Sequence, residues 1–222
     1  MSSPTLLALE TATDACSVAL RHAGGVAARH EVAPRRHTEL VIEMLDAVLG
    51  EAALARAALD AVAFGQGPGS FTGVRVAAAL AQGIALGRGL PVCGVSTLAA
   101  LAAGAARGGH RGRVVALLDA RRAEVYAATF DCTDGTAHRL GDDVLITPEA
   151  LLLPPGDDWL AVGNGWDVYA ERLAPELRAL PRAADPYPHA VDVATLATRA
   201  LAAGRGRDAG AALPAYLRGA LD

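Results

Sequence analysis

Short apolar runs separated by glycine, proline and charged residues predict that strands and helices share the chain. Apolar runs of about four to eight residues are typical of strands, and apolar positions that recur every three or four residues are typical of helices. The expected strands cover residues 5–10, 15–21, 26–32, 59–64, 91–95, 114–119, 124–130, 144–146 and 159–162. The expected helices cover residues 37–49, 54–58, 74–86, 98–107 and 193–203, with another that follows the turn at 163–166 and ends near 173. Residues 175–188 are proline-rich and are expected to be irregular.

The helix predicted over residues 37–49 is apolar around more of its circumference than one sheet needs. At about 100° per residue its apolar side chains spread over an arc of about 200°, whereas a surface helix needs a stripe of about 100°. These side chains are Leu40, Val41, Ile42, Met44, Leu45, Val48 and Leu49. The excess predicts either a partner subunit on the second face or cover from another part of the same chain.

The stretch Gly65–Arg75 is the densest run of backbone-permissive residues in the chain. It lies between a predicted buried strand and a predicted helix that is rich in alanine and glycine. Free amide groups at the start of that helix would suit an anion, and Ser70 and Thr72 are candidate caps. The alternative is a tight strand-to-helix turn that binds nothing. The helix itself is apolar almost all round, which predicts a central and interfacial position.

No nucleotide motif is complete in this glycine stretch. A Walker loop ends in a lysine, and the chain contains none. The dinucleotide fingerprint G-x-G-x-x-G is not met, because the run is G-x-G-x-G and the next strand does not end in an acid. A serine elbow has glycine two residues either side of the serine, whereas Ser70 has Pro68 and Thr72 there.

Histidine and cysteine positions predict no metal site. The six histidines show no i,i+4 pair and no short spacing to a cysteine. The three cysteines lie far apart in apolar contexts, so small core thiols are expected. Asp119 with Arg121, Arg122 and Glu124 forms a charged cluster, which predicts either a solvated hairpin tip or the edge of a site.

Composition favours a folded globular protein. Of 222 residues, 52% are hydrophobic and 20% are charged, which argues against disorder. No stretch approaches about eighteen apolar residues free of glycine and charge, and the N-terminus lacks a basic region before a long apolar run. We therefore expect a cytoplasmic protein without membrane association. A net charge of −4 disfavours nucleic-acid binding by the chain alone through a broad basic surface.

The glycine-rich, charged segment Arg107–Arg113 predicts a boundary between two lobes, residues 1–107 and 108–222. On each side of it an apolar strand ends in an acid, Glu10 or Asp119, and a short turn leads to a second apolar strand. This repeated outline suggests an internal duplication. The second lobe is expected to be smaller, and its C-terminal helix and tail are candidates for packing back on the first.

Several long motifs resemble the bacterial TsaB (YeaZ) family. They are LALETATDACSVAL (7–20), RRHTELVIEML (35–45), GQGPGSFTGVRVAAALAQGIALGRGLPVCGVSTLAAL (65–101), ALLDARRAEVYAATF (116–130) and PAYLR (214–218). The resemblance covers nearly the whole chain. It implies the α/β fold of the actin/sugar-kinase/Hsp70 (ASKHA) class, with two related lobes, each a mixed sheet flanked by helices.

The resemblance implies a non-catalytic role. Members of the family bind the related catalytic subunit TsaD and, with the ATPase TsaE, support threonylcarbamoylation of the adenosine beside the anticodon of tRNA. The two metal-binding histidines of the catalytic relative correspond to Thr97 and Leu101, neither of which replaces a histidine ligand. The family's usual Asp in the first strand turn is Glu10 here. No cofactor and no metal are therefore expected, with a nucleotide at the partner interface left open.

The resemblance also implies that the first-lobe helices form the partner surface, and that the same surface makes a homodimer when the chain is alone. Contact with tRNA is expected only through the complex. The expected interface residues are His37, Leu40, Val41, Met44, Leu45, Val48, Arg75, Val76 and Leu80. Met44→Glu or Val48→Asp is then predicted to abolish partner binding and leave the protein folded.

Two other functions compete with this one. The first is an active small-molecule kinase of the same fold, with Gly67 and Gly69 near phosphate and with Glu10 and Asp119 as its acids. These four residues are the weak candidates for nucleotide binding. The second is a dinucleotide-dependent oxidoreductase, which rests on the strand–glycine–helix pattern alone.

Overall fold

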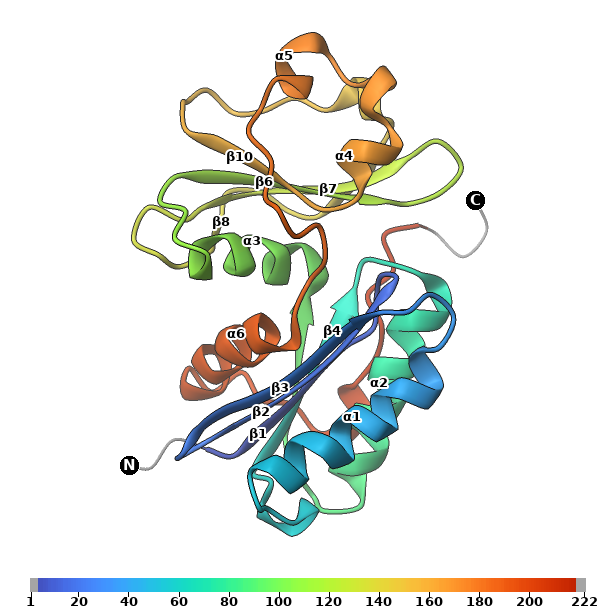
Figure 1. Cartoon of the computed structure of the whole chain (residues 1–222), viewed down its shortest axis with the longest axis vertical. Helices are drawn as coiled ribbons and strands as arrows, with labels where there is room; N and C mark the ends of the chain where they lie inside the picture. The colour runs from blue at the N-terminus through green and yellow to red at the C-terminus, as the bar shows by residue number, and fades with distance from the viewer. Residues whose placement is uncertain (1–3, 219–222) are drawn as a thin grey trace.

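The computed structural model describes residues 4–218, which form two sheets with helices on their faces (Figure 1). The first sheet has the order β3-β2-β1-β4-β5 and the second the order β10-β6-β7-β8, with β9 also paired to β7. The first consists of β1 (Leu6–Glu10), β2 (Ala15–His22), β3 (Gly25–Val32), β4 (Ala61–Gly67) and β5 (Val92–Ser96). The second consists of β6 (Arg113–Asp119), β7 (Val125–Asp131), β8 (His138–Arg139), β9 (Val144–Ile146) and β10 (Trp159–Val162).

Both sheets are mixed. In the first, β1 pairs antiparallel with β2 and parallel with β4, and β4 pairs parallel with β5. In the second, β6 pairs antiparallel with β7 and parallel with β10. The two predicted pairs of apolar strands joined by a short turn are confirmed as the antiparallel hairpins β1–β2 and β6–β7. The short strand β8 was not predicted, because two exposed residues carry no apolar pattern.

Three long helices cover the first sheet. The helices α1 (His37–Glu51) and α2 (Phe71–Leu86) lie on one face, and α6 (Ala190–Ala202) lies on the other. Alternate residues of β1 face the two layers, since Leu7 and Leu9 pack with α1 and α2, whereas Leu6 and Ala8 pack with α6. This two-sided burial explains why all five residues of β1 are buried and why its sequence is apolar without alternation.

The second sheet is covered by α3 (Thr97–Arg107) on one face and by α4 (Gly165–Val168) and α5 (Pro175–Arg178) on the other. Helices α3 and α6 pack together between the two sheets (Figure 1). There the Arg107 guanidinium donates to both carboxylate oxygens of Asp192, at 2.9 and 3.0 Å. The described structure also has four 3₁₀ turns, η1 (Arg56–Ala58), η2 (Pro148–Ala150), η3 (Ala170–Arg172) and η4 (Ala209–Ala211).

Every strand of the first sheet precedes residue 97 and every strand of the second follows residue 112, whereas α6 returns to the first sheet. Helix α3 precedes the predicted boundary but covers the second sheet. The division into residues 1–107 and 108–222 stays a prediction, and residues 1–3 and 219–222 lie outside the described part of the chain.

Helix ends were the least accurate part of the sequence prediction. Helix α2 begins at Phe71, three residues before the predicted start, because the Ser70 hydroxyl accepts the Gly73 N–H at 3.1 Å. Helix α1 continues past Gly50 to Glu51. The predicted helix over 54–58 is only η1, the one ending near 173 divides into α4 and η3, and the segment over 175–188 contains α5. Helix α6 begins at Ala190, whose N–H donates to the buried Ser17 hydroxyl.

The broad apolar arc of α1 is covered by the chain itself. Six of its seven residues are at most 7% exposed, and they pack with the strands of the first sheet. The exception is Ile42, which is 41% exposed. Val48 is fully buried and Met44 is 7% exposed, so we now expect Val48→Asp and Met44→Glu to destabilise the fold, in contrast to the prediction from the sequence.

Candidate functional site

A cavity of about 600 Å³ opens between the two sheets. Its wall comes from three places: the turn Ala12–Asp14 with the start of α2, the segment Leu118–Arg122 at the end of β6, and the tail residues 215–218. Small-molecule sites have volumes of this size and commonly lie between domains. We call this cavity the cleft, and it is the candidate functional site.

The glycine run beside the cleft allows two backbone turns to pack closely. The Ser70 N–H donates to the Ala12 carbonyl at 2.7 Å, and the Thr11 hydroxyl donates to the Gly73 carbonyl at 2.7 Å. A Cβ added at Gly69 would lie 2.4 Å from the Ala12 carbonyl oxygen, and one at Gly73 would lie 1.9 Å from that of Thr11. These glycines thus have a packing role that requires no ligand.

Gly67, a candidate for nucleotide binding, also has a structural reason to be glycine. Its φ of +102° lies in the region that favours glycine, and the Ala215 carbonyl oxygen is 3.1 Å from the position of an added Cβ. Beside it, the Ala215 N–H donates to the Gln66 carbonyl at 2.7 Å. The loop therefore supports the C-terminal tail where the tail enters the cleft wall.

Glu10 lies beneath the cleft, and it is not among the residues that line it. Its side chain is fully buried, its carboxylate accepts the Ala12 N–H at 2.7 Å, and the Thr97 hydroxyl donates to it at 3.3 Å. The carboxylate fills the space where Gly65 has no side chain. Burial raises the pKa of Glu10 to about 7, although these hydrogen bonds oppose the rise. A carboxyl group enclosed in this way is not placed to coordinate an ion in the cleft.

Asp119 lines the cleft, but both of its oxygens are occupied. One accepts the Arg121 N–H and the Tyr169 hydroxyl, each at 2.7 Å, and the other pairs with the Arg121 guanidinium at 3.0 Å. Burial and this hydrogen bond raise the pKa of Tyr169. Arg121, Arg122 and Ala123 all have φ between 52° and 62°, in the left-handed region. Three such residues in a row cost energy, and the bonds from Asp119 help to hold this turn in place.

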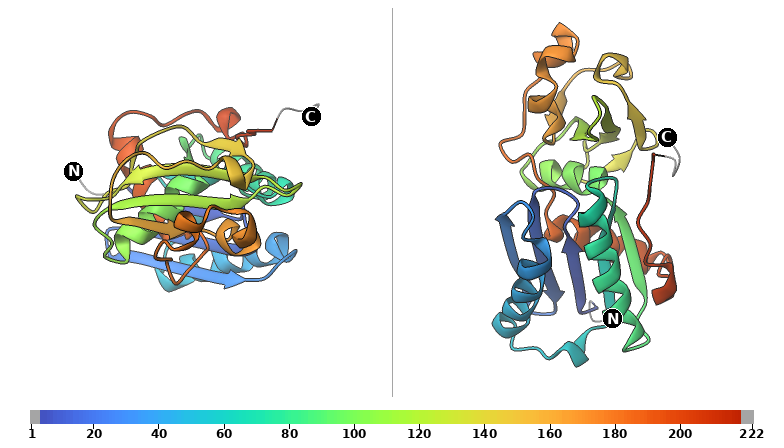
Figure 2. Two further views of the ribbon diagram at one scale, coloured as in Figure 1. Left: turned by 90° about the horizontal axis from the view of Figure 1, so that it is seen from above. Right: turned by 90° about the vertical axis from the view of Figure 1, so that its right-hand side faces the viewer.

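An arginine and two aromatic rings form the opposite rim of the cleft. The Arg75 guanidinium lies 3.5 Å from the Phe71 ring centroid, and its Nε donates to the Tyr216 hydroxyl at 2.8 Å. Tyr216 belongs to the tail, which continues towards the second sheet (Figure 2, right). There Arg218 pairs with Glu124 at 2.6 Å and donates to the Ala120 carbonyl at 3.1 Å. The tail therefore bonds to both sides of the cleft.

The charges on the cleft wall favour an anion. Four arginines line it against two aspartates, although Arg121 is paired with Asp119 and Arg218 with Glu124. The lining arginines are Arg75, Arg121, Arg122 and Arg218. The sequence had identified the cluster around Asp119 as either a hairpin tip or a site edge. It gave no indication of the contact between Arg75 and Tyr216, which are 141 residues apart.

The residues expected at a partner interface differ in how far they are buried. Leu40, Val41, Met44, Leu45 and Val48 are buried in the chain's own core. Val76 and Leu80 on α2 are partly buried beside that core, and Arg75 is exposed at the cleft rim. The His37 ring makes a hydrogen bond with the Thr13 carbonyl at 2.7 Å. Thr97 and Leu101, the positions that the resemblance compared with metal ligands, are also buried.

Two mixed sheets flanked by helices, with a cleft between them, define an α/β protein and are consistent with the actin/sugar-kinase/Hsp70 (ASKHA) class that the resemblance implied. Residues 9–215 match the family model described as TsaD: tRNA N6-adenosine threonylcarbamoyltransferase. The solved structure of YeaZ from Pseudomonas aeruginosa is 44% identical, superposes with a TM-score of 0.91, and covers 98% of this chain and 100% of that one.

Two similar relatives carry the name tRNA threonylcarbamoyladenosine biosynthesis protein TsaB. The one from Escherichia coli is 38% identical over 218 residues, which are 96% of this chain and 94% of that protein. The one from Haemophilus influenzae is 40% identical over 180 residues, or 77% of this chain and 76% of that protein. The chain belongs to the TsaB (YeaZ) family.

Proposed function

We propose that this chain is an accessory subunit in the formation of threonylcarbamoyladenosine in tRNA. It binds a TsaD-type catalytic subunit and acts with the ATPase TsaE, and tRNA meets it only within that complex. The observation that carries the proposal is the match over nearly the full length of a relative named for this biosynthesis. We further propose a cytoplasmic location, and no helix among residues 4–218 is long and apolar enough to cross a membrane.

The bonds that already engage the candidate acids, Glu10 and Asp119, support a role without catalysis. A kinase of this fold needs carboxylates that are free to hold a metal–nucleotide complex. Glu10 is enclosed beneath the cleft, and Asp119 is bonded to Arg121 and Tyr169. Of the two positions that match the relative's metal ligands, Thr97 donates its hydroxyl to Glu10 and Leu101 lies in the hydrophobic core.

The exposed faces of α1 and α2 are the proposed partner surface, which also serves a homodimer when the partner is absent. Ile42 is exposed on α1 among the acids Glu39, Glu43 and Asp46, whereas the outer face of α2 offers Ala79 and Gly83 beside the partly buried Val76 and Leu80. Small residues allow another helix to approach closely, and the acids would fix its orientation through charge.

The double variant Ile42→Arg/Ala79→Arg is expected to stop co-elution with the TsaD-type subunit in gel filtration and to lower self-association in sedimentation. Both side chains are exposed, so its thermal unfolding should stay close to that of the wild type. Leu152→Arg is the matched control, because Leu152 is 85% exposed and lies outside both helices. Co-elution of the double variant at the wild-type level would contradict this interface.

The isolated chain is expected to hydrolyse no ATP above a buffer blank, since its candidate acids are engaged. A coupled assay that detects released ADP measures this, with and without Mg²⁺. If turnover were found and Asp119→Asn abolished it, the kinase alternative would replace the accessory role.

A further inference from the structure

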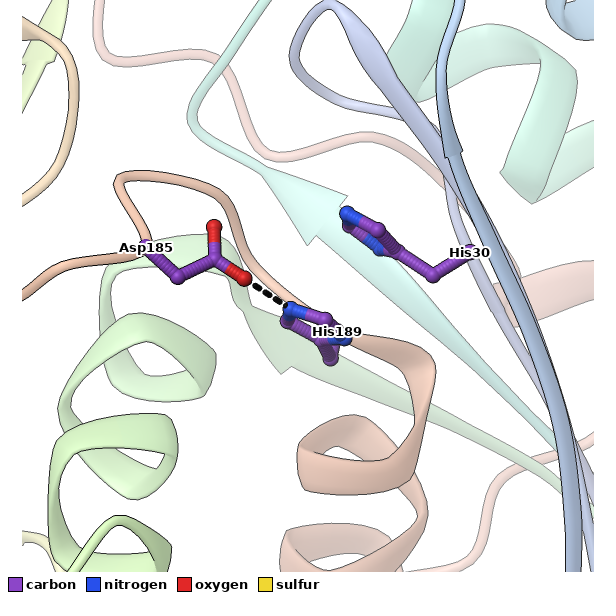
Figure 3. A group of neighbouring side chains, drawn as sticks. All are labelled: His30, Asp185 and His189. Atoms are coloured by element: carbon purple, nitrogen blue, oxygen red, sulfur yellow. Dashed lines mark hydrogen bonds and ion pairs between the residues drawn. The ribbon is translucent and has the colours of Figure 1, made fainter.

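Three potential metal ligands from distant parts of the chain meet beside the first sheet. They are His30 on the edge strand β3, and Asp185 and His189 on the segment that leads to α6 (Figure 3). Each offers one ligand atom, and these atoms all lie within 4.8 Å of one another. None of the three lines the cleft. The group is therefore separate from the candidate site described above.

Backbone contacts fix all three positions. His30 pairs in register with Ser17 of β2, and the Ser17 hydroxyl accepts the Ala190 N–H at 3.0 Å, directly after His189. One carboxylate oxygen of Asp185, Oδ1, accepts the Tyr187 N–H at 2.9 Å. The strand and the connecting segment are thus held together at this point by bonds that do not use the ligand atoms.

One nitrogen in the group has no partner. Among the described side chains that are not exposed, His30 Nδ1 is the one buried nitrogen or oxygen without a hydrogen bond. Buried polar atoms nearly always have a partner, so an unpaired one in a cluster of ligand-type groups points to an ion or a water molecule.

The remaining contacts show what must change when an ion binds. The His30 and His189 rings are stacked, with centroids 3.8 Å apart and planes 13° from parallel. The lone pairs of stacked rings lie in two separate, nearly parallel planes, so one ring must turn out of the stack for both rings to direct a nitrogen at one ion. His189 Nε2 lies 2.5 Å from an Asp185 oxygen, so this hydrogen bond must break before both atoms can bind one ion, and its proton moves to the other ring nitrogen or to solvent.

We propose that His30, Asp185 and His189 bind one divalent transition-metal ion, for which Zn²⁺ is the best match. Two imidazoles and one carboxylate suit Zn²⁺, Co²⁺ or Ni²⁺, whereas Mg²⁺ and Ca²⁺ prefer oxygen ligands throughout. Because the segment that carries Asp185 and His189 runs from the second sheet to α6, the ion would tie this connection to β3 of the first sheet. The proposal does not depend on the proposed function.

Calorimetric titration of Zn²⁺ into the chelator-treated full chain, without an affinity tag, tests the site. One ion per chain is expected, and Asp185→Ala and His189→Ala should weaken binding by at least about tenfold. Asp185 is half exposed, so its replacement should leave the fold intact, which circular dichroism checks. The matched control is His138→Ala, because His138 and Asp134 form the same i,i+4 ion pair at 2.9 Å but are not part of the three-ligand group.

Co²⁺ provides a second measurement on the same variants. The wild type and His138→Ala should give visible d–d absorption with one Co²⁺ per chain, and His30→Ala should not. Saturating Zn²⁺ should also raise the melting temperature of the wild type more than that of Asp185→Ala. No binding to the wild type, or binding that all three ligand variants retain at the wild-type level, would overturn the proposal.

Discussion

Gly73→Ala is expected to destabilise the protein by about 3 kcal/mol or more, because the added methyl group meets backbone that has no room to move. Its Cβ would lie 1.9 Å from the Thr11 carbonyl oxygen and 2.6 Å from the Ser70 hydroxyl that caps α2. Thr11 is itself held in place, because its hydroxyl donates to the Gly73 carbonyl. Urea denaturation followed by circular dichroism measures the loss.

Gly83→Ala is the matched control for Gly73→Ala, since both positions lie in α2. Nothing lies within 4 Å of a Cβ added at Gly83, so the substitution should stabilise the protein by about 0.5–1 kcal/mol through helix propensity. Opposite signs for the two substitutions would support close packing between the glycine run and the Thr11–Ala12 turn. Equal effects would refute it.

Glu10→Gln is expected to stabilise the protein at neutral pH and above. The folded-state pKa of about 7 lies above the ordinary pKa of 4.5, so the contribution of Glu10 is greatest below pH 4.5 and is lost as the pH rises to 7. The loss amounts to about 1.4 kcal/mol per pH unit, or about 3 kcal/mol in all. Glutamine stays neutral and can still accept the Ala12 N–H, so the variant escapes this loss.

The measurement is the free energy of unfolding of both proteins at several pH values between 4.5 and 8. The advantage of Glu10→Gln should grow across that window and then level off above pH 7. Glu43→Gln, on the exposed side of α1, is the control and should show no such growth. A constant difference between Glu10→Gln and the wild type at every pH would show that folding does not raise the pKa of Glu10.

The sequence predicted the strands well because their apolar runs are long and are bounded by turn residues. Residues 6–9 are apolar at every position, which predicted a strand, and the structure covers both of its faces, with α1 and α2 on one and α6 on the other. The sequence did not show whether a partner subunit or the chain itself covers the wide apolar arc of α1. A periodic pattern shows that a face is buried, but it does not identify the surface that buries it.

The contacts that define the cleft and the proposed metal site join residues that are far apart in the chain. Arg75 meets Tyr216, and His30 meets Asp185 and His189, at separations that no spacing rule covers. The spacing rules for metal ligands compare histidines with histidines and cysteines, whereas the proposed group combines an aspartate with two histidines from different segments, so the sequence did not predict it. The burial of Glu10 could not be predicted either, because its carboxylate occupies space left by Gly65 of the neighbouring strand.

The most direct test of the accessory role is threonylcarbamoylation of unmodified tRNA, reconstituted from purified subunits and followed by mass spectrometry of the nucleosides. With the TsaD-type subunit and the TsaE-type ATPase present, threonylcarbamoyladenosine should form when this chain is added and fall to background when it is left out. This chain alone should form none. Equal product with and without this chain would contradict the account.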